Sequence, residues 1–174
     1  MILSIIVISI IGTISHFLYD LSNHNKILGL FVAVNESTWE HIKIAITPTL
    51  LYSLYDGIIY GFNPNYFTAK LISLLSLCIF IPLIFYTYQI FTKKSIAFIN
   101  ILIFYISIII SQFLFYCIIN AEPVSKIIQY ISVVGLFVFF GAYLLLTLLP
   151  LKNPLFKDPI TNKYGFNRHN KNSS

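Results

Sequence analysis

Long runs of apolar residues, separated by short polar breaks, fill the chain from residue 1 to about residue 149. Each run is long enough for the roughly 20 helical residues that cross the hydrocarbon core of a bilayer. The runs are continuous and do not alternate with polar residues, which favours helices over a transmembrane β-barrel. The pattern predicts an all-α fold, a polytopic transmembrane helix bundle of about five spans. We place these spans at 1–20, 37–60, 67–91, 95–119 and 125–149.

The composition agrees with a membrane location. Of the 174 residues, 57% are hydrophobic and only 10% are charged, whereas soluble domains carry about 25% charged residues. A soluble fold of this length could not bury so much apolar surface, so we expect lipid to cover it. We divide the chain into a transmembrane helical domain, residues 1–150, and a cytoplasmic basic tail, residues 151–174. The abundance of Ile, Asn and Lys is typical of a bacterium with an AT-rich genome.

Basic residues are distributed unequally between the two ends of the predicted bundle. With five spans, the N-terminus and the breaks near 61–66 and 120–124 share one side, which carries Lys70 and Lys126. The positive-inside rule therefore places the N-terminus outside a cell membrane and the tail in the cytoplasm. We expect the tail to contact anionic lipid rather than nucleic acid, and the sequence predicts no oligomeric state. The cytoplasmic side carries the other nine basic residues: Lys26, Lys43, Lys93, Lys94, Lys152, Lys157, Lys163, Arg168 and Lys171.

Ionisable residues gather where the first two spans reach the cytoplasmic side. His16 and Asp20 are four residues apart and therefore share one helix face. Ser37 and Glu40 fit the first and last positions of a capping box, with Asn35 as a rival cap. Because ionisable groups at membrane depth are costly, we expect them to form a functional polar pocket. The candidate pocket residues are His16, Asp20, Asn35, Glu36, Glu40, His41 and Lys43.

Later spans and the tail also place side chains near the cytoplasmic end of the predicted bundle. Asn100 in the fourth span and Tyr143 in the fifth predict a cavity that opens to the cytoplasm and is built from all five helices. Apolar residues near Phe156 and Gly165 are expected to fold back over the mouth of this cavity. The last residues, 167–174, are expected to be disordered.

Two further residues are assigned to the membrane interfaces. Trp39 begins the second span and is expected to anchor it at the interface, where Trp is enriched. Asp56 lies near the opposite end of the same span, and we expect it at the opposite interface.

Three interpretations of the polar pocket stay open, and the sequence does not decide whether the protein is an enzyme. In a structural network, Asp20 orients His16 while Glu40 caps its helix and pairs with Lys43. In a metal-dependent hydrolase, His16, Asp20 and Glu40 bind a divalent metal ion that activates water, although no established metal-binding spacing such as HExxH is present. In a transporter, the carboxylates bind a cation or relay protons.

A resemblance comes from the string VNESTWEHIK at residues 34–43, with HFLYD at 16–20 before it and FKDPITNKYG at 156–165 after it. These segments resemble an uncharacterised prokaryotic family, a domain of unknown function, of small multi-pass membrane proteins with a VNES-x-WEH-x-K motif. The resemblance implies the same membrane fold and a tail that belongs to the folded unit, but it implies no reaction or substrate. We therefore predict a small multi-pass membrane protein that binds a small ligand or ion in the polar pocket.

Overall fold

The structure, a computed structural model, describes residues 1–166. Its long elements are all helices, and each lies within two residues of the run from which it was predicted. The prediction of an all-α bundle is therefore confirmed. The helices are α1 (Ile2–Leu21), α2 (Thr38–Tyr60), α3 (Tyr66–Thr92), α4 (Ala97–Ile119) and α5 (Lys126–Leu148), with short 3-10 helices η1 (Leu28–Leu30) and η2 (Pro154–Phe156).

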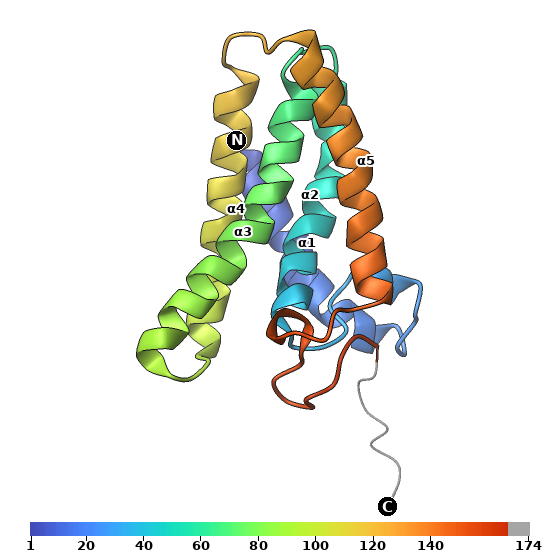
Figure 1. Cartoon of the computed structure of the whole chain (residues 1–174), viewed down its shortest axis with the longest axis vertical. Coiled ribbons are helices and arrows are strands. Elements are labelled where there is room, and N and C mark those ends of the chain that lie inside the picture. Colours follow the sequence, from blue (N-terminus) through green and yellow to red (C-terminus); the bar gives the residue numbers. More distant parts are fainter. Residues whose placement is uncertain (167–174) are drawn as a thin grey trace, which may run out of the picture.

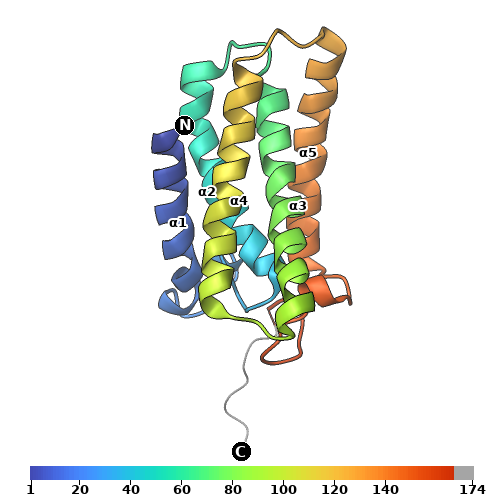
Figure 2. The ribbon, with the colours of Figure 1, turned by 90° about the vertical axis from the view of Figure 1, so that its left-hand side faces the viewer.

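The five helices run side by side along the long axis of the molecule (Figures 1 and 2). The connections 61–65 and 120–125 lie at one end, which we call the short-loop end. The segments 22–37, 93–96 and 149–166 lie at the other end, which we call the tail end. Helix α3 packs against α2, α4 and α5, while α1 packs against α2 and α4.

Four of the helices, α1, α3, α4 and α5, are long and apolar enough to cross a membrane. Helix α2 is less apolar because its first turns carry Glu40, His41 and Lys43. It nevertheless runs between α1 and α3, and the side chains of Glu40 and Lys43 are buried inside the bundle. Because these two charges do not face lipid, we expect α2 to cross the membrane with the other four helices.

The start of α2 is capped by Ser37, the first of the two predicted candidates. The side chain of Ser37 accepts the amide of Glu40 at 3.4 Å, as the capping box requires. The amide of Ser37 itself donates to Asn35 Oδ1 at 2.8 Å, so Asn35 holds the cap residue in place and is not the cap. The Glu40 carboxylate does not complete the box and accepts the Val34 amide instead, at 2.9 Å.

The tail packs against the start of α2, as expected. Asn35 Nδ2 donates to the Gly165 carbonyl at 2.9 Å, and the ring of Phe156 lies 5.0 Å from that of Trp39. The prediction that Trp39 sits at the membrane interface is wrong, because this contact and Thr147 bury it to 6% exposure. The expected disorder of 167–174 concerns residues outside the described range.

Asp56, which we expected at the opposite interface, is buried inside the bundle. Asp56 is 4% exposed, and its Oδ2 accepts from Lys70 Nζ at 2.6 Å. The same ammonium lies 4.3 Å from the centre of the Phe115 ring. The short-loop end of the bundle therefore contains an internal ion pair, which removes both charges from the lipid-facing surface.

Candidate functional site

Glu40 and Lys43 form a closed, buried network near the tail end. Lys43 Nζ lies 2.9 Å from Glu40 Oε2 and donates to the Gly29 carbonyl at 2.8 Å. Because the same Glu40 oxygen also accepts the Val34 amide, the pair fastens the segment 28–34 to α2. With Lys43 fully buried and Glu40 2% exposed, these charges are bound to the protein and unavailable to a ligand. This part of the predicted structural network is present.

Glu36 lies in a different arrangement, between two histidines. Its carboxylate oxygens lie 3.8 Å from His16 Nε2 and 3.9 Å from His41 Nε2. The two imidazole rings are 5.8 Å apart between their centres. His41 is held from its other side, because its Nδ1 lies 3.0 Å from the Ser37 carbonyl. All three side chains of this cluster, which we call the Glu36 cluster, are between 25% and 30% exposed.

Asp20 lies beside a different histidine, His24. Its carboxylate lies 3.3 Å from His24 Nε2, and both side chains are about 60% exposed. The three residues predicted to bind a metal are thus placed in three separate ion pairs, His16 with Glu36, Asp20 with His24 and Glu40 with Lys43. Within residues 1–166, no group of three or more His, Cys, Asp or Glu side chains is arranged to hold a metal ion.

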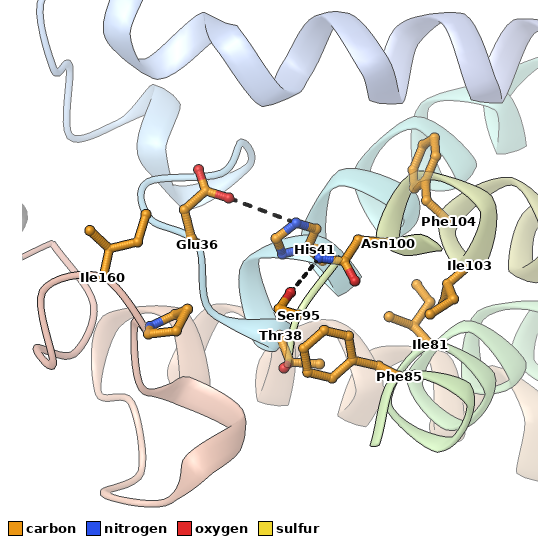
Figure 3. Close-up of a pocket in the computed structure, with 11 residues that line it drawn as sticks. Glu36, Thr38, His41, Ile81, Phe85, Ser95, Asn100, Ile103, Phe104 and Ile160 are labelled. Atoms are coloured by element: carbon orange, nitrogen blue, oxygen red, sulfur yellow. Dashed lines mark hydrogen bonds and ion pairs between the residues drawn. The ribbon is translucent and has the colours of Figure 1, made fainter. Parts of the chain in front are cut away.

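Two adjoining cavities open beside the Glu36 cluster, with volumes of about 310 and 320 Å³. They share Glu36, His41, Asn100 and Phe104 in their walls, so we treat them as one polar cavity with two lobes. The first lobe lies between α3, α4 and the tail, and Figure 3 shows its apolar wall opposite Glu36 and His41. That wall is formed by Ile81, Phe85, Ile103 and Phe104, and the tail contributes Pro159 and Ile160.

The second lobe lies between α1 and α4. Helix α1 contributes His16, with Thr13 and Phe17 on either side of it, and α4 contributes Ala97, Ile101 and Tyr105. Together the lobes exceed the lower size of small-molecule sites, about 300 Å³. Their walls are largely apolar. The ionisable side chains gather around Glu36, while Thr13 and Tyr105 bond to each other at the other end of the second lobe.

Asn100 is held in place by its neighbours at the boundary of the two lobes. Its Oδ1 accepts from Tyr88 at 2.6 Å. Its Nδ2 donates to Ser95 at 2.8 Å (Figure 3). The prediction that Asn100 lies at this depth is correct. The prediction that all five helices build the cavity is wrong, because no residue of α5 lines either lobe. Tyr143 instead bonds to Thr47 at 2.8 Å in the packed core.

Several lining residues were not predicted. Ile81, Phe85, Phe104 and Ile101 look like any other apolar residue of a span, and the sequence holds no signal for them. Tyr105 was the one detectable case, because a Tyr in the middle of an apolar run must find a polar partner. It finds Thr13 across the bundle, at 3.1 Å.

The charge of the polar cavity is set by Glu36. Among the described residues that line the two lobes, it is the only carboxylate, and none is Lys or Arg. Lys43, the one Lys among the predicted pocket residues, instead pairs with Glu40 and donates to the Gly29 carbonyl. This carboxylate, with no Lys or Arg among the described lining residues, favours a ligand that donates hydrogen bonds or is positively charged.

Comparison with known proteins agrees with this architecture. Residues 1–166 match a family described as a family of unknown function, DUF6512. The chain belongs to this family. The match covers α1 to α5 and the packed part of the tail, which confirms that the chain belongs to a family of unknown function. Neither the curated proteins nor the solved structures gave a match.

Proposed function

We propose that this DUF6512 protein binds a small amphipathic ligand in its polar cavity, with the polar group of the ligand at Glu36, His16 and His41. The observation that carries the proposal is the Glu36 carboxylate, held between two imidazoles at 3.8 and 3.9 Å at the tail end of a largely apolar cavity.

The spacing of the Glu36 cluster supports a binding role. A charge-assisted hydrogen bond is about 2.7–2.9 Å long, so separations of 3.8 and 3.9 Å are looser than a closed pair. An N–H or O–H group of a ligand would find a carboxylate acceptor and two imidazole nitrogens within reach. A primary amine fits this set best, because it adds a positive charge opposite Glu36.

The apolar walls define the rest of the ligand. Phe85, Ile103 and Phe104 line the first lobe, and Ile44, Phe17 and Ile101 line the second. Burying a methylene group against such walls contributes about 0.8 kcal/mol. A ligand with an alkyl chain therefore gains more from this cavity than an ion or a small polar molecule does.

We further propose that the protein lies in the cell membrane with the tail end in the cytoplasm. The tail end contains Lys26, Lys93 and Lys94 in its connections, while the two connections at the short-loop end contain none. Under the positive-inside rule, this distribution favours a cytoplasmic tail and an outside N-terminus. The polar cavity then faces the cytoplasmic leaflet, and the basic residues of the tail lie near anionic lipid.

The test uses two amphiphiles of equal chain length. Purified protein in a nonionic detergent is titrated with dodecylamine or with dodecanoate, and thermal unfolding is followed by the fluorescence of its one Trp, Trp39. We expect dodecylamine to raise the unfolding temperature and dodecanoate to leave it unchanged.

The matched variants are Glu36→Gln and Glu122→Gln. Glu122 is an exposed acid at the short-loop end, so its substitution changes the net charge equally without touching the cavity. We expect only Glu36→Gln to abolish the stabilisation by dodecylamine. Equal stabilisation of both variants would show that the amine acts on the micelle or the surface, and would reject the proposal.

A further inference from the structure

The polar cavity has a wall that faces lipid. Its second lobe lies between α1 and α4, two helices that are long and apolar enough to cross a membrane. Two of its lining residues, Phe17 on α1 and Ile101 on α4, are also 59% and 54% exposed. Side chains that line a cavity and face the outside at the same time mark its opening. This opening points sideways into the bilayer rather than along the axis of the bundle.

The opening has a closed floor toward the middle of the membrane. Gly12 of α1 packs so closely that an added Cβ would lie 2.6 Å from the Phe104 ring and from the Ile44 carbonyl oxygen. One residue further, Thr13 donates to the Ser9 carbonyl and accepts from Tyr105, which joins α1 to α4 at 3.1 Å. The lobe lies between the two helices on the tail-end side of this contact.

The depth of the lobe matches one leaflet. On α4 its lining extends from Ala97 to Tyr105, which corresponds to roughly 12 Å of helix at 1.5 Å per residue. Half of a hydrocarbon core is about 15 Å thick. The lobe therefore follows most of the inner leaflet, with the Glu36 cluster at its tail end, apolar side chains along its length, and the paired hydroxyls of Thr13 and Tyr105 at its floor.

We propose that the ligand is an amine-bearing lipid of the surrounding leaflet, which enters sideways between α1 and α4. The inference rests on the proposed function and adds the source and the route of the ligand. The ammonium group lies at Glu36, His16 and His41, while the alkyl chain leaves between Phe17 and Ile101 and stays in the bilayer. Polar and apolar parts of the cavity have the same order along the membrane normal as the parts of such a lipid.

The experiment compares a lipid with a short, water-soluble amine. Protein is reconstituted in nanodiscs that contain equal amounts of dioleoyl phosphatidylethanolamine and dioleoyl phosphatidylglycerol, and the lipid that remains bound after ejection from the nanodisc is identified by native mass spectrometry. Binding of hexylamine is measured separately by thermal unfolding. We expect the wild-type protein to retain phosphatidylethanolamine and to bind hexylamine.

Two variants separate the route from the site. Ala97→Phe fills the lobe between α1 and α4, whereas Gly141→Phe adds the same ring to α5 at a position whose Cβ would meet nothing within 4 Å. We expect Ala97→Phe to lower the amount of bound phosphatidylethanolamine about tenfold or more while it still binds hexylamine. Gly141→Phe should retain the lipid. Glu36→Gln should lose both ligands, because it removes the negative charge that faces the ammonium group.

The outcomes distinguish the two proposals. Hexylamine binding without retained phosphatidylethanolamine, or equal lipid retention by Ala97→Phe and the wild type, would overturn lateral entry and leave the proposed function in place. Binding of neither ligand would overturn both. If Ala97→Phe does not fold, Ile101→Trp and Phe137→Trp, each in a Trp39→Phe background, replace it. Brominated phosphatidylethanolamine should then quench the fluorescence of the Ile101→Trp variant more strongly than that of the Phe137→Trp variant, and equal quenching would overturn the inference.

Discussion

Glu36 and Glu40 are four residues apart in the sequence, yet the structure gives them opposite environments. Glu40 is buried and bonded to Lys43 and to the Val34 amide at 2.9 Å each. Glu36 is partly exposed, lines both lobes of the polar cavity and stays 3.8 Å or more from its histidines. Within five residues, the chain therefore places one carboxylate in the packed core and the other in the wall of a cavity. The closed pair fastens the segment 28–34 to α2, and the looser cluster is the one that we propose contacts a ligand.

The largest effect should follow from breaking the closed pair. Lys43→Met leaves the Glu40 carboxylate buried without its cation, which costs about 3–5 kcal/mol. The Gly29 carbonyl also loses its donor. We expect thermal unfolding in detergent to occur at a much lower temperature, and the double variant Glu40→Leu/Lys43→Met to be more stable than Lys43→Met alone. A double variant that is no more stable than Lys43→Met would show that the attraction between these charges is not what fastens the segment 28–34 to α2.

A smaller effect is expected from Asn35, which connects α2 to the tail. Asn35→Ala removes the acceptor of the Ser37 amide and the donor to the Gly165 carbonyl. Buried groups left without partners cost about 1–3 kcal/mol each. We expect trypsin to cleave the tail at Lys157 and Lys163 faster in this variant. The control is Asn120→Ala, which removes an exposed bond to the Tyr116 carbonyl at the short-loop end. Cleavage at the wild-type rate in Asn35→Ala would mean that other contacts, such as Phe156 on Trp39, hold the tail.

The local sequence pattern was enough to predict the helices and the pairing of Glu40 with Lys43. Apolar runs and polar breaks gave the helix ends, and the i, i+3 spacing of Glu40 and Lys43 gave their pairing. Partners across the bundle were not predictable in this way. Helical periodicity puts His16 and Asp20 on one face, but it does not show that the segment 22–37 brings Glu36 back to His16.

Trp39 was misplaced for a related reason. A Trp near a helix end suits both a membrane interface and a buried site with a partner for its ring N–H. Only the tail, more than 100 residues later in the chain, decides between them by placing Phe156 against its ring. The cavity walls were hidden because apolar residues that line a cavity and those that face lipid have the same composition.

Glu36→Gln is expected to separate binding from stability. The Glu36 ion pairs are partly exposed, and such pairs contribute only about 0.2–1 kcal/mol. The unfolding temperature without ligand should therefore change little, in contrast to Glu40→Gln, which leaves Lys43 buried without a carboxylate. A fall as large as that of Glu40→Gln would assign Glu36 to the structural network and remove the difference between the two acids.

The smallest effect on stability is expected from Asp20→Asn. The same variant tests whether Asp20 binds a metal ion, as one interpretation of the sequence predicted. Asp20 pairs with His24 beyond the end of α1, and both side chains are about 60% exposed; many such surface ion pairs contribute nothing measurable to stability. Asp20→Asn should therefore leave unfolding, dodecylamine binding and the metal content of the purified protein unchanged. A stoichiometric transition metal that is lost in Asp20→Asn, His16→Ala and Glu40→Gln alike would contradict this expectation. Three side chains that occupy separate ion pairs here would then have to meet around one ion, and Glu40 would have to leave Lys43. The stability of Lys43→Met would respond to added metal in that case, whereas a closed structural pair predicts no response.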